Sequence, residues 1–149
     1  MAATNDPHEA LFLMFKKLRD DDTGAGGLAN TTGNQYLPGF IRSWEIQAIG
    51  SPPIPRVVFE VIDDRDESPF AGDSPSCMVR LHLFTVQDAG GAKEQAILTR
   101  MRTVYKGVPL SLQGGFNGGR SNWRRTVRAP VSDTNLNHRV VEITTKIGV

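Results

Sequence analysis

The chain has little cysteine, no long apolar run and no strong excess of either charge, and each shortage excludes a class of protein. A single cysteine, Cys77, in 149 residues rules out an intramolecular disulfide and a multi-cysteine zinc site, and its place in an apolar segment predicts a small core residue. The apolar runs are far too short to cross a bilayer. The N-terminus lacks the basic and apolar segments of a secretory signal, so we expect a cytosolic origin.

The net charge of +1 conceals a split along the chain. Residues 1–75 hold six lysines and arginines against twelve acidic residues, a charge of −6, whereas residues 76–149 hold eleven against four, a charge of +7. If the two sets separate in the fold, the molecule has an acidic side and a basic side that favour head-to-tail association. If they interleave on the surface, they cancel.

Hydrophobic spacing predicts one α+β domain over residues 1–149, with an antiparallel or mixed sheet, an N-terminal helix and a second helix packed on the sheet. The first helix is expected over residues 7–19, because Asp6 suits the N-cap and Pro7 the first helical position. The second is expected over residues 92–106, with its apolar stripe toward the sheet and Glu94 outside that stripe. Strands are expected over residues 44–49, 56–62, 77–86, 121–129 and 139–147, the last two as an antiparallel hairpin.

The strand at 77–86 is the clearest signal in the chain. Cys77, Val79, Leu81, Leu83 and Thr85 alternate with more polar residues, which predicts one core face and one mixed face. Glycine-rich stretches predict flexible loops at about residues 20–39 and 113–120, and the first of these either is a long loop or orders only against a partner.

Two glycine-rich stretches match nucleotide-binding motifs in sequence pattern but not in the structural context that those motifs require. The segment from Gly114 to Ser121 has Arg120 where a P-loop has lysine, and it runs into an expected strand instead of a helix. The segment from Gly24 to Ala29 follows an expected helix, without the strand that a dinucleotide site requires. We therefore predict no nucleotide and no other cofactor.

An acidic run after the second expected strand concentrates several carboxylates. It spans residues 63–67, and a metal-dependent nuclease or hydrolase needs several carboxylates around Mg²⁺. Runs of this kind in turns are more often solvated loops, so we predict no metal site. His8, His82 and His138 have no partners at helical spacing that would favour zinc, and no nucleophile motif indicates a catalytic residue. We expect no enzyme.

Arginines concentrate on the expected C-terminal hairpin, beside Trp123, and strand alternation predicts that Arg124 and Arg128 share a face. This surface suits either nucleic acid, through phosphate pairing and base stacking, or the acidic residues of a neighbouring subunit. We favour a subunit contact, because the whole chain lacks the strong positive charge of dedicated nucleic-acid binders. The hairpin arginines are Arg120, Arg124, Arg125, Arg128 and Arg139.

The order of these elements resembles one protein family. The resemblance lies in the helix ALFLMFKKL (10–18), the strands PRVVFEV (55–61) and VRLHLFT (79–85), the helix AILTRMR (96–102) and the strand HRVVEI (138–143). Together they are similar to the tail terminator, or tail completion, proteins of long-tailed bacteriophages. The glycine-rich stretches at 24–39 and 114–119 are where the chain departs from the family pattern.

The resemblance implies a structural virion protein at the head-proximal end of the tail, assembled in the host cytoplasm and without membrane contact. Such a protein forms a ring, expected to be a homohexamer, that caps the tail tube, ends tail polymerisation and offers a docking face to the head–tail connector. Genomic DNA passes through the lumen without sequence-specific binding. The family has no catalytic residues to carry over, so the interface prediction comes from charge alone: Asp63, Asp64, Asp66, Glu67, Arg124, Arg125 and Arg128.

Overall fold

The computed structural model describes residues 6–45, 53–63, 76–87, 91–129 and 136–148, and these form one α+β domain. The elements follow the chain in this order: α1 (Pro7–Asp20), β1 (Gly39–Arg42), β2 (Arg56–Asp63), β3 (Ser76–Val86), α3 (Ala92–Tyr105), β4 (Pro109–Ser111), β5 (Asn117–Arg120), β6 (Asn122–Arg128) and β7 (Leu136–Gly148). The predicted fold class, with two helices on a mixed sheet, is confirmed.

The strands form a curled seven-stranded sheet with the order β1-β2-β3-β7-β5-β4, and β6 also pairs with β7. Only β1 and β2 run parallel; the other pairs are antiparallel. The long strand β7 pairs with β3 along one side, and with β6 and the start of β5 along the other. The strands β1 and β6 therefore lie on opposite sides of the central strands.

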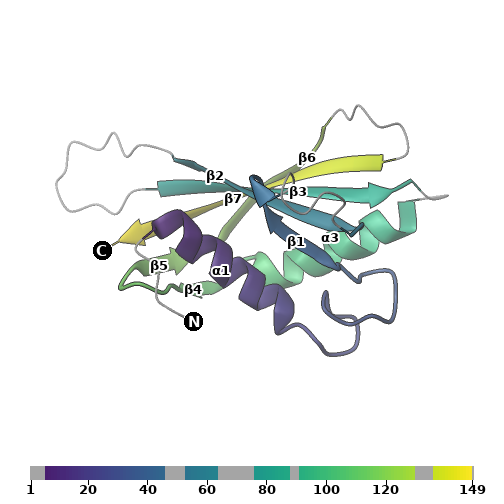
Figure 1. Cartoon of the computed structure of the whole chain (residues 1–149), viewed down its shortest axis with the longest axis horizontal. Coiled ribbons are helices and arrows are strands. Elements are labelled where there is room, and N and C mark those ends of the chain that lie inside the picture. The colour runs from purple at the N-terminus through teal and green to yellow at the C-terminus, as the bar shows by residue number, and fades with distance from the viewer. Residues whose placement is uncertain (1–5, 46–52, 64–75, 88–90, 130–135, 149) are drawn as a thin grey trace.

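Both helices lie on the same side of the sheet (Figure 1). The helix α1 begins as predicted, since the side chain of Asp6 accepts from the amide of His8 at 2.9 Å and Pro7 occupies the first turn. The ring of Phe15 on α1 stacks on Tyr105 of α3 with centroids 5.1 Å apart. The hydroxyl of Tyr105 donates to the Phe15 carbonyl at 3.0 Å, so the two helices are joined through a buried polar contact.

The predicted alternation in β3 is confirmed. Its odd-numbered residues, including Cys77, are buried in the core with the apolar sides of both helices. The second helix has one buried residue that the sequence placed outside its stripe, Glu94, which is 4% exposed. Its carboxylate accepts from Nε of Arg139 at 2.8 Å, so an ion pair with β7 offsets the cost of burial.

The prediction of a strand at residues 44–49 is wrong where the structure describes it. Ser43 and Trp44 form a turn, Glu45 lies in a helical conformation, and the remaining residues lie outside the described part. The chain instead forms β1 five residues earlier, from Gly39 to Arg42. A side chain at Gly39 would meet Cβ of Arg56 at 2.6 Å, so only glycine lets β1 approach β2 this closely.

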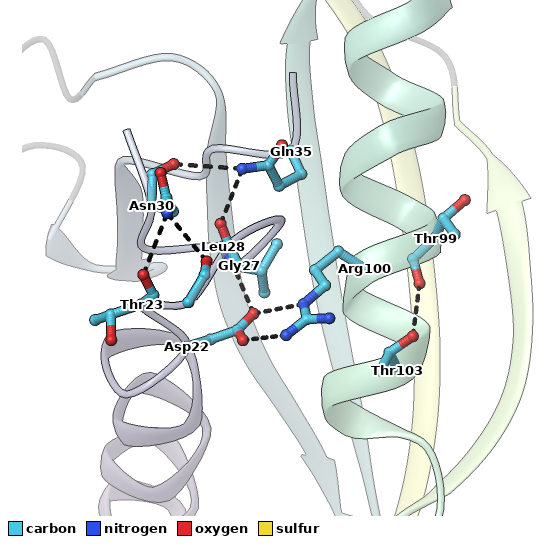
Figure 2. A network of polar contacts seen from close by, with 10 residues as sticks. Asp22, Thr23, Gly27, Leu28, Asn30, Gln35, Thr99, Arg100 and Thr103 are labelled. Atoms are coloured by element: carbon cyan, nitrogen blue, oxygen red, sulfur yellow. Dashed lines mark hydrogen bonds and ion pairs between the residues drawn. The ribbon is translucent and has the colours of Figure 1, made fainter. Parts of the chain in front are cut away.

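The glycine-rich loop after α1 packs within the chain. Leu28 and Leu37 are fully buried, and Asp22 accepts from the Leu28 amide and from Nε of Arg100 on α3, each at 2.8 Å. The side chain of Gln35 donates to the carbonyl of Thr32 at 2.7 Å. Figure 2 shows this network between the loop and α3. These contacts lie within the chain, so the loop adopts its conformation without a partner protein.

The second glycine-rich stretch, which the sequence predicts to be flexible over residues 113–120, contains the whole of β5, and β6 begins two residues after its end. A strand therefore follows these glycines at the place where a P-loop has a helix.

Candidate functional site

The face of the sheet that neither described helix covers carries cross-strand rows of side chains. Glu60, Arg80, Glu142 and Arg125 lie side by side on β2, β3, β7 and β6. Glu142 accepts from Nε of Arg80 at 3.1 Å and also from Arg125. The hydrogen bond from Arg125, assisted by Arg80, outweighs burial and lowers the pKa of Glu142. The row alternates in charge and is largely neutralised within the chain.

A second row on this open face brings together two histidines that are 56 residues apart in sequence. Nδ1 of His82 lies 3.0 Å from Nε2 of His138, and Nε2 of His82 lies 3.1 Å from a carboxylate oxygen of Glu60. Phe84 stacks on His138 with centroids 4.3 Å apart. No pattern along the chain predicts this cluster, because the pairing of β3 with β7 creates it.

The predicted interface arginines all lie on β6, but on two faces. Trp123 pairs with Ile143 whereas Arg125 pairs with Glu142, so Arg124 is the extra residue of a β-bulge. The expectation that Arg124 and Arg128 share a face is therefore wrong: Arg128 lies opposite Arg139 on the helix side of the sheet, and Arg124 lines a hollow with Met78 of the open face.

Of the predicted acidic interface residues, only Asp63 belongs to the described part of the chain, as the last residue of β2. Asp64, Asp66 and Glu67 lie outside the described residues. The interface between these acids and the β6 arginines therefore stays a prediction.

A hollow of about 270 Å³ lies where the start of α1 meets β1 and β2. Arg42 at its centre donates to Glu9 from Nε at 2.7 Å, and it also bonds Glu45. The guanidinium carbon lies 3.9 Å from the centroid of Phe12 and 5.6 Å from that of Trp44. The bond from Glu9, strengthened by Glu45, raises the pKa of Arg42 against the effect of burial.

Trp44 forms part of the wall of this hollow and is 70% exposed. Exposed tryptophans of this kind are enriched at the energetic centres of protein interfaces. The sequence analysis missed both Arg42 and Trp44 as candidate site residues. The available signal is a tryptophan that lies between two charged residues, Arg42 and Glu45. The incorrect prediction of a strand at 44–49 assigned this tryptophan to the strand instead of to an exposed turn.

Within the described ranges, no group of three or more histidine, cysteine or acidic side chains is placed to hold a metal ion. The same part of the chain contains no helix with the length and apolar character needed to cross a membrane.

Comparison with known proteins gives one informative similarity. No family model matches the chain, and no curated protein matches it. Among solved structures, a chain from "Virion of native gene transfer agent (GTA) particle" has a TM-score of 0.66 and 15% sequence identity, over 97% of this chain and 98% of that one. At this identity the similarity establishes a shared fold: the whole chain has the architecture of a protein found in a virion particle.

Proposed function

We propose that this chain is a structural virion protein, and specifically a tail terminator. In this proposal a homohexameric ring of the protein caps the tail tube at the head-proximal end, ends tail polymerisation and receives the head–tail connector. Assembly takes place in the host cytoplasm, and the genome passes through the ring without sequence-specific contacts. The protein has no catalytic role.

The observation that carries the proposal is the fold similarity to a virion chain over nearly the full length of both proteins. The resemblance of the helix and strand segments to tail terminators agrees with it independently. The uncovered sheet face and the exposed Trp44 supply surfaces suited to contact with other subunits.

The main test is the growth of tail tubes in vitro. Tube protein from the same virus would be polymerised with and without this chain, and tube length and tube ends would be examined by negative-stain electron microscopy. We expect a ring at one end of each tube and no further growth from that end. An unrelated protein at equal concentration is the control. Tubes that elongate at the control rate without a cap would rule out the terminator role.

Two alternatives make different predictions. A nucleic-acid-binding module would bind DNA with an affinity that falls steeply with salt, yet two of the hairpin arginines are already paired, Arg125 with Glu142 and Arg139 with Glu94. A nuclease using the acidic run at 63–67 would cleave DNA in the presence of Mg²⁺ and lose that activity in the Asp64→Ala variant. We expect neither result.

A further inference from the structure

The two edges of the sheet formed by β1, β2, β3, β7 and β6 lie beside groups of opposite charge. The order β1-β2-β3-β7, with β6 on the far side of β7, places β1 and β6 at opposite edges. A surface on one edge that is complementary to a surface on the other can join subunits head to tail, and such contacts close into a ring when the rotation allows.

The hollow beside β1 is acidic. The guanidinium of Arg42 bonds the carboxylates of Glu9 and Glu45, and Asp6 also lines the hollow, so carboxylates outnumber the guanidinium. The hollow also has an aromatic wall, since Phe12 and Trp44 line it and Trp44 is exposed. A site with excess negative charge and an exposed indole suits a second arginine, which forms hydrogen bonds to carboxylates and stacks on aromatic rings.

The edge strand β6 supplies two exposed arginines. Arg124 and Arg128 form no ion pair with any residue that the structure describes. Arg128 lies directly opposite Arg139 in the register, an arrangement of like charges that destabilises a strand pair unless an acid relieves it. Arg139 is bonded to Glu94, and no described acidic side chain pairs with Arg128.

We infer that the β6 edge of one subunit docks into the α1–β1 hollow of the next, with an arginine of β6 entering between the carboxylates and the ring of Trp44. The partner is a second copy of this chain. The inference rests on the proposed ring. It assigns the contact between subunits to two defined surfaces, the β6 edge and the α1–β1 hollow, instead of to a general attraction between the acidic and basic halves of the sequence. Arg125 contributes little in this arrangement, because Glu142 already neutralises it.

Two variants separate the two surfaces. The hollow variant is Trp44→Ala, which removes an exposed ring and leaves the core intact; the edge variant is Arg124→Glu with Arg128→Glu. Matched controls are Val86→Ala, another exposed apolar residue at 47% exposure, and Arg102→Glu, an exposed arginine on α3. Circular dichroism and the unfolding midpoint would establish that each variant is folded.

Mass photometry and sedimentation velocity would then measure assembly, with and without tail tubes. We expect the wild type and both controls to form rings, and each surface variant alone to assemble at least about tenfold more weakly, as befits the loss of a central anchor. An equimolar mixture of the two variants retains one intact contact per pair, so it should give a two-chain complex and no ring. Arg124→Lys with Arg128→Lys keeps the charge without the planar group and should be intermediate.

The possible failures are distinguishable. Rings from either surface variant at wild-type concentration, or a mixture that stays monomeric, would overturn the docking inference even if tubes were still capped. A wild type that remains monomeric with and without tubes would also overturn it. Rings that follow the expected pattern but never cap a tube would support the docking inference and contradict the proposed function.

Discussion

Along β3, Val79, Leu81 and Leu83 face the helices and are buried, whereas Arg80 and His82 between them face away from both helices and are half-buried. The two faces differ in how they are stabilised. The covered face depends on apolar packing with α1 and α3, and the open face depends on hydrogen bonds between side chains of neighbouring strands. Apolar packing tolerates little change in shape, while exposed polar contacts contribute little each. The covered face therefore determines folding, and the open face is available for assembly.

The sharpest test of this difference compares two adjacent valines on β7. Val141 is fully buried on the covered face, and Val140 is half-buried on the open face. Val141→Ala should lower the free energy of unfolding by about 2–3 kcal/mol, because it leaves a cavity in the core. Val140→Ala should cost less than about 1 kcal/mol. Urea denaturation measures both, and equal losses would remove the distinction between the faces.

The next largest loss of stability is expected from breaking an ion pair on the covered side of the sheet. Asp22 ties the loop after α1 to Arg100, and this hydrogen bond lowers the pKa of Asp22 despite partial burial. Asp22→Asn should cost about 1–2 kcal/mol at pH 7. Because the folded pKa is depressed, the contribution is complete above the unfolded value near 3.9 and is lost as pH falls through the folded pKa. A loss of equal size at pH 2 and pH 7 would contradict this explanation.

The corresponding carboxylate on the open face is Glu142, and its effect should be smaller. The hydrogen bond from Arg125 is the main reason that the pKa of Glu142 is lowered. The Arg125 side chain is 69% exposed, so solvent screens this pair. Glu142→Gln should cost about 1 kcal/mol at pH 7, and this effect should be lost as pH falls through the lowered folded pKa of Glu142. A titration of unfolding free energy against pH for both variants, with Arg102→Glu as control, would compare the two faces directly.

The smallest expected effect is that of Val86→Ala on the open face. This side chain is 47% exposed, so its truncation should change stability by less than about 0.5 kcal/mol. A larger change, measured by thermal denaturation, would mean that the open face is packed against something within the chain.

Local signals predicted the long elements well. The N-cap Asp6 and Pro7 fix the start of α1, which ends one residue later than expected, and the alternation in β3 places its boundary within one residue. Cys77 lies in the core as expected. Each of these features depends on neighbours in sequence, which a local pattern contains.

The short strands and the charged clusters could not be predicted from local sequence patterns, because they depend on residues far apart in the chain. The four-residue strand β1 exists only because it pairs with β2, whose first residue lies 17 positions after Gly39. The bulge at Arg124 moves Arg128 to the other face, and it arises from the register with β7. The burial of Glu94 likewise depends on Arg139, which is 45 residues away.

The sequence by itself determined the fold class, both helices and the core faces of the long strands, because periodic burial of apolar side chains is a local property of the chain. Only the tertiary structure decided which charges meet. Side chains from distant strands come together through register, and register is set by pairing between segments that the sequence does not connect. The acidic hollow at β1 and the exposed positions of Arg124 and Arg128 on β6 are products of that pairing.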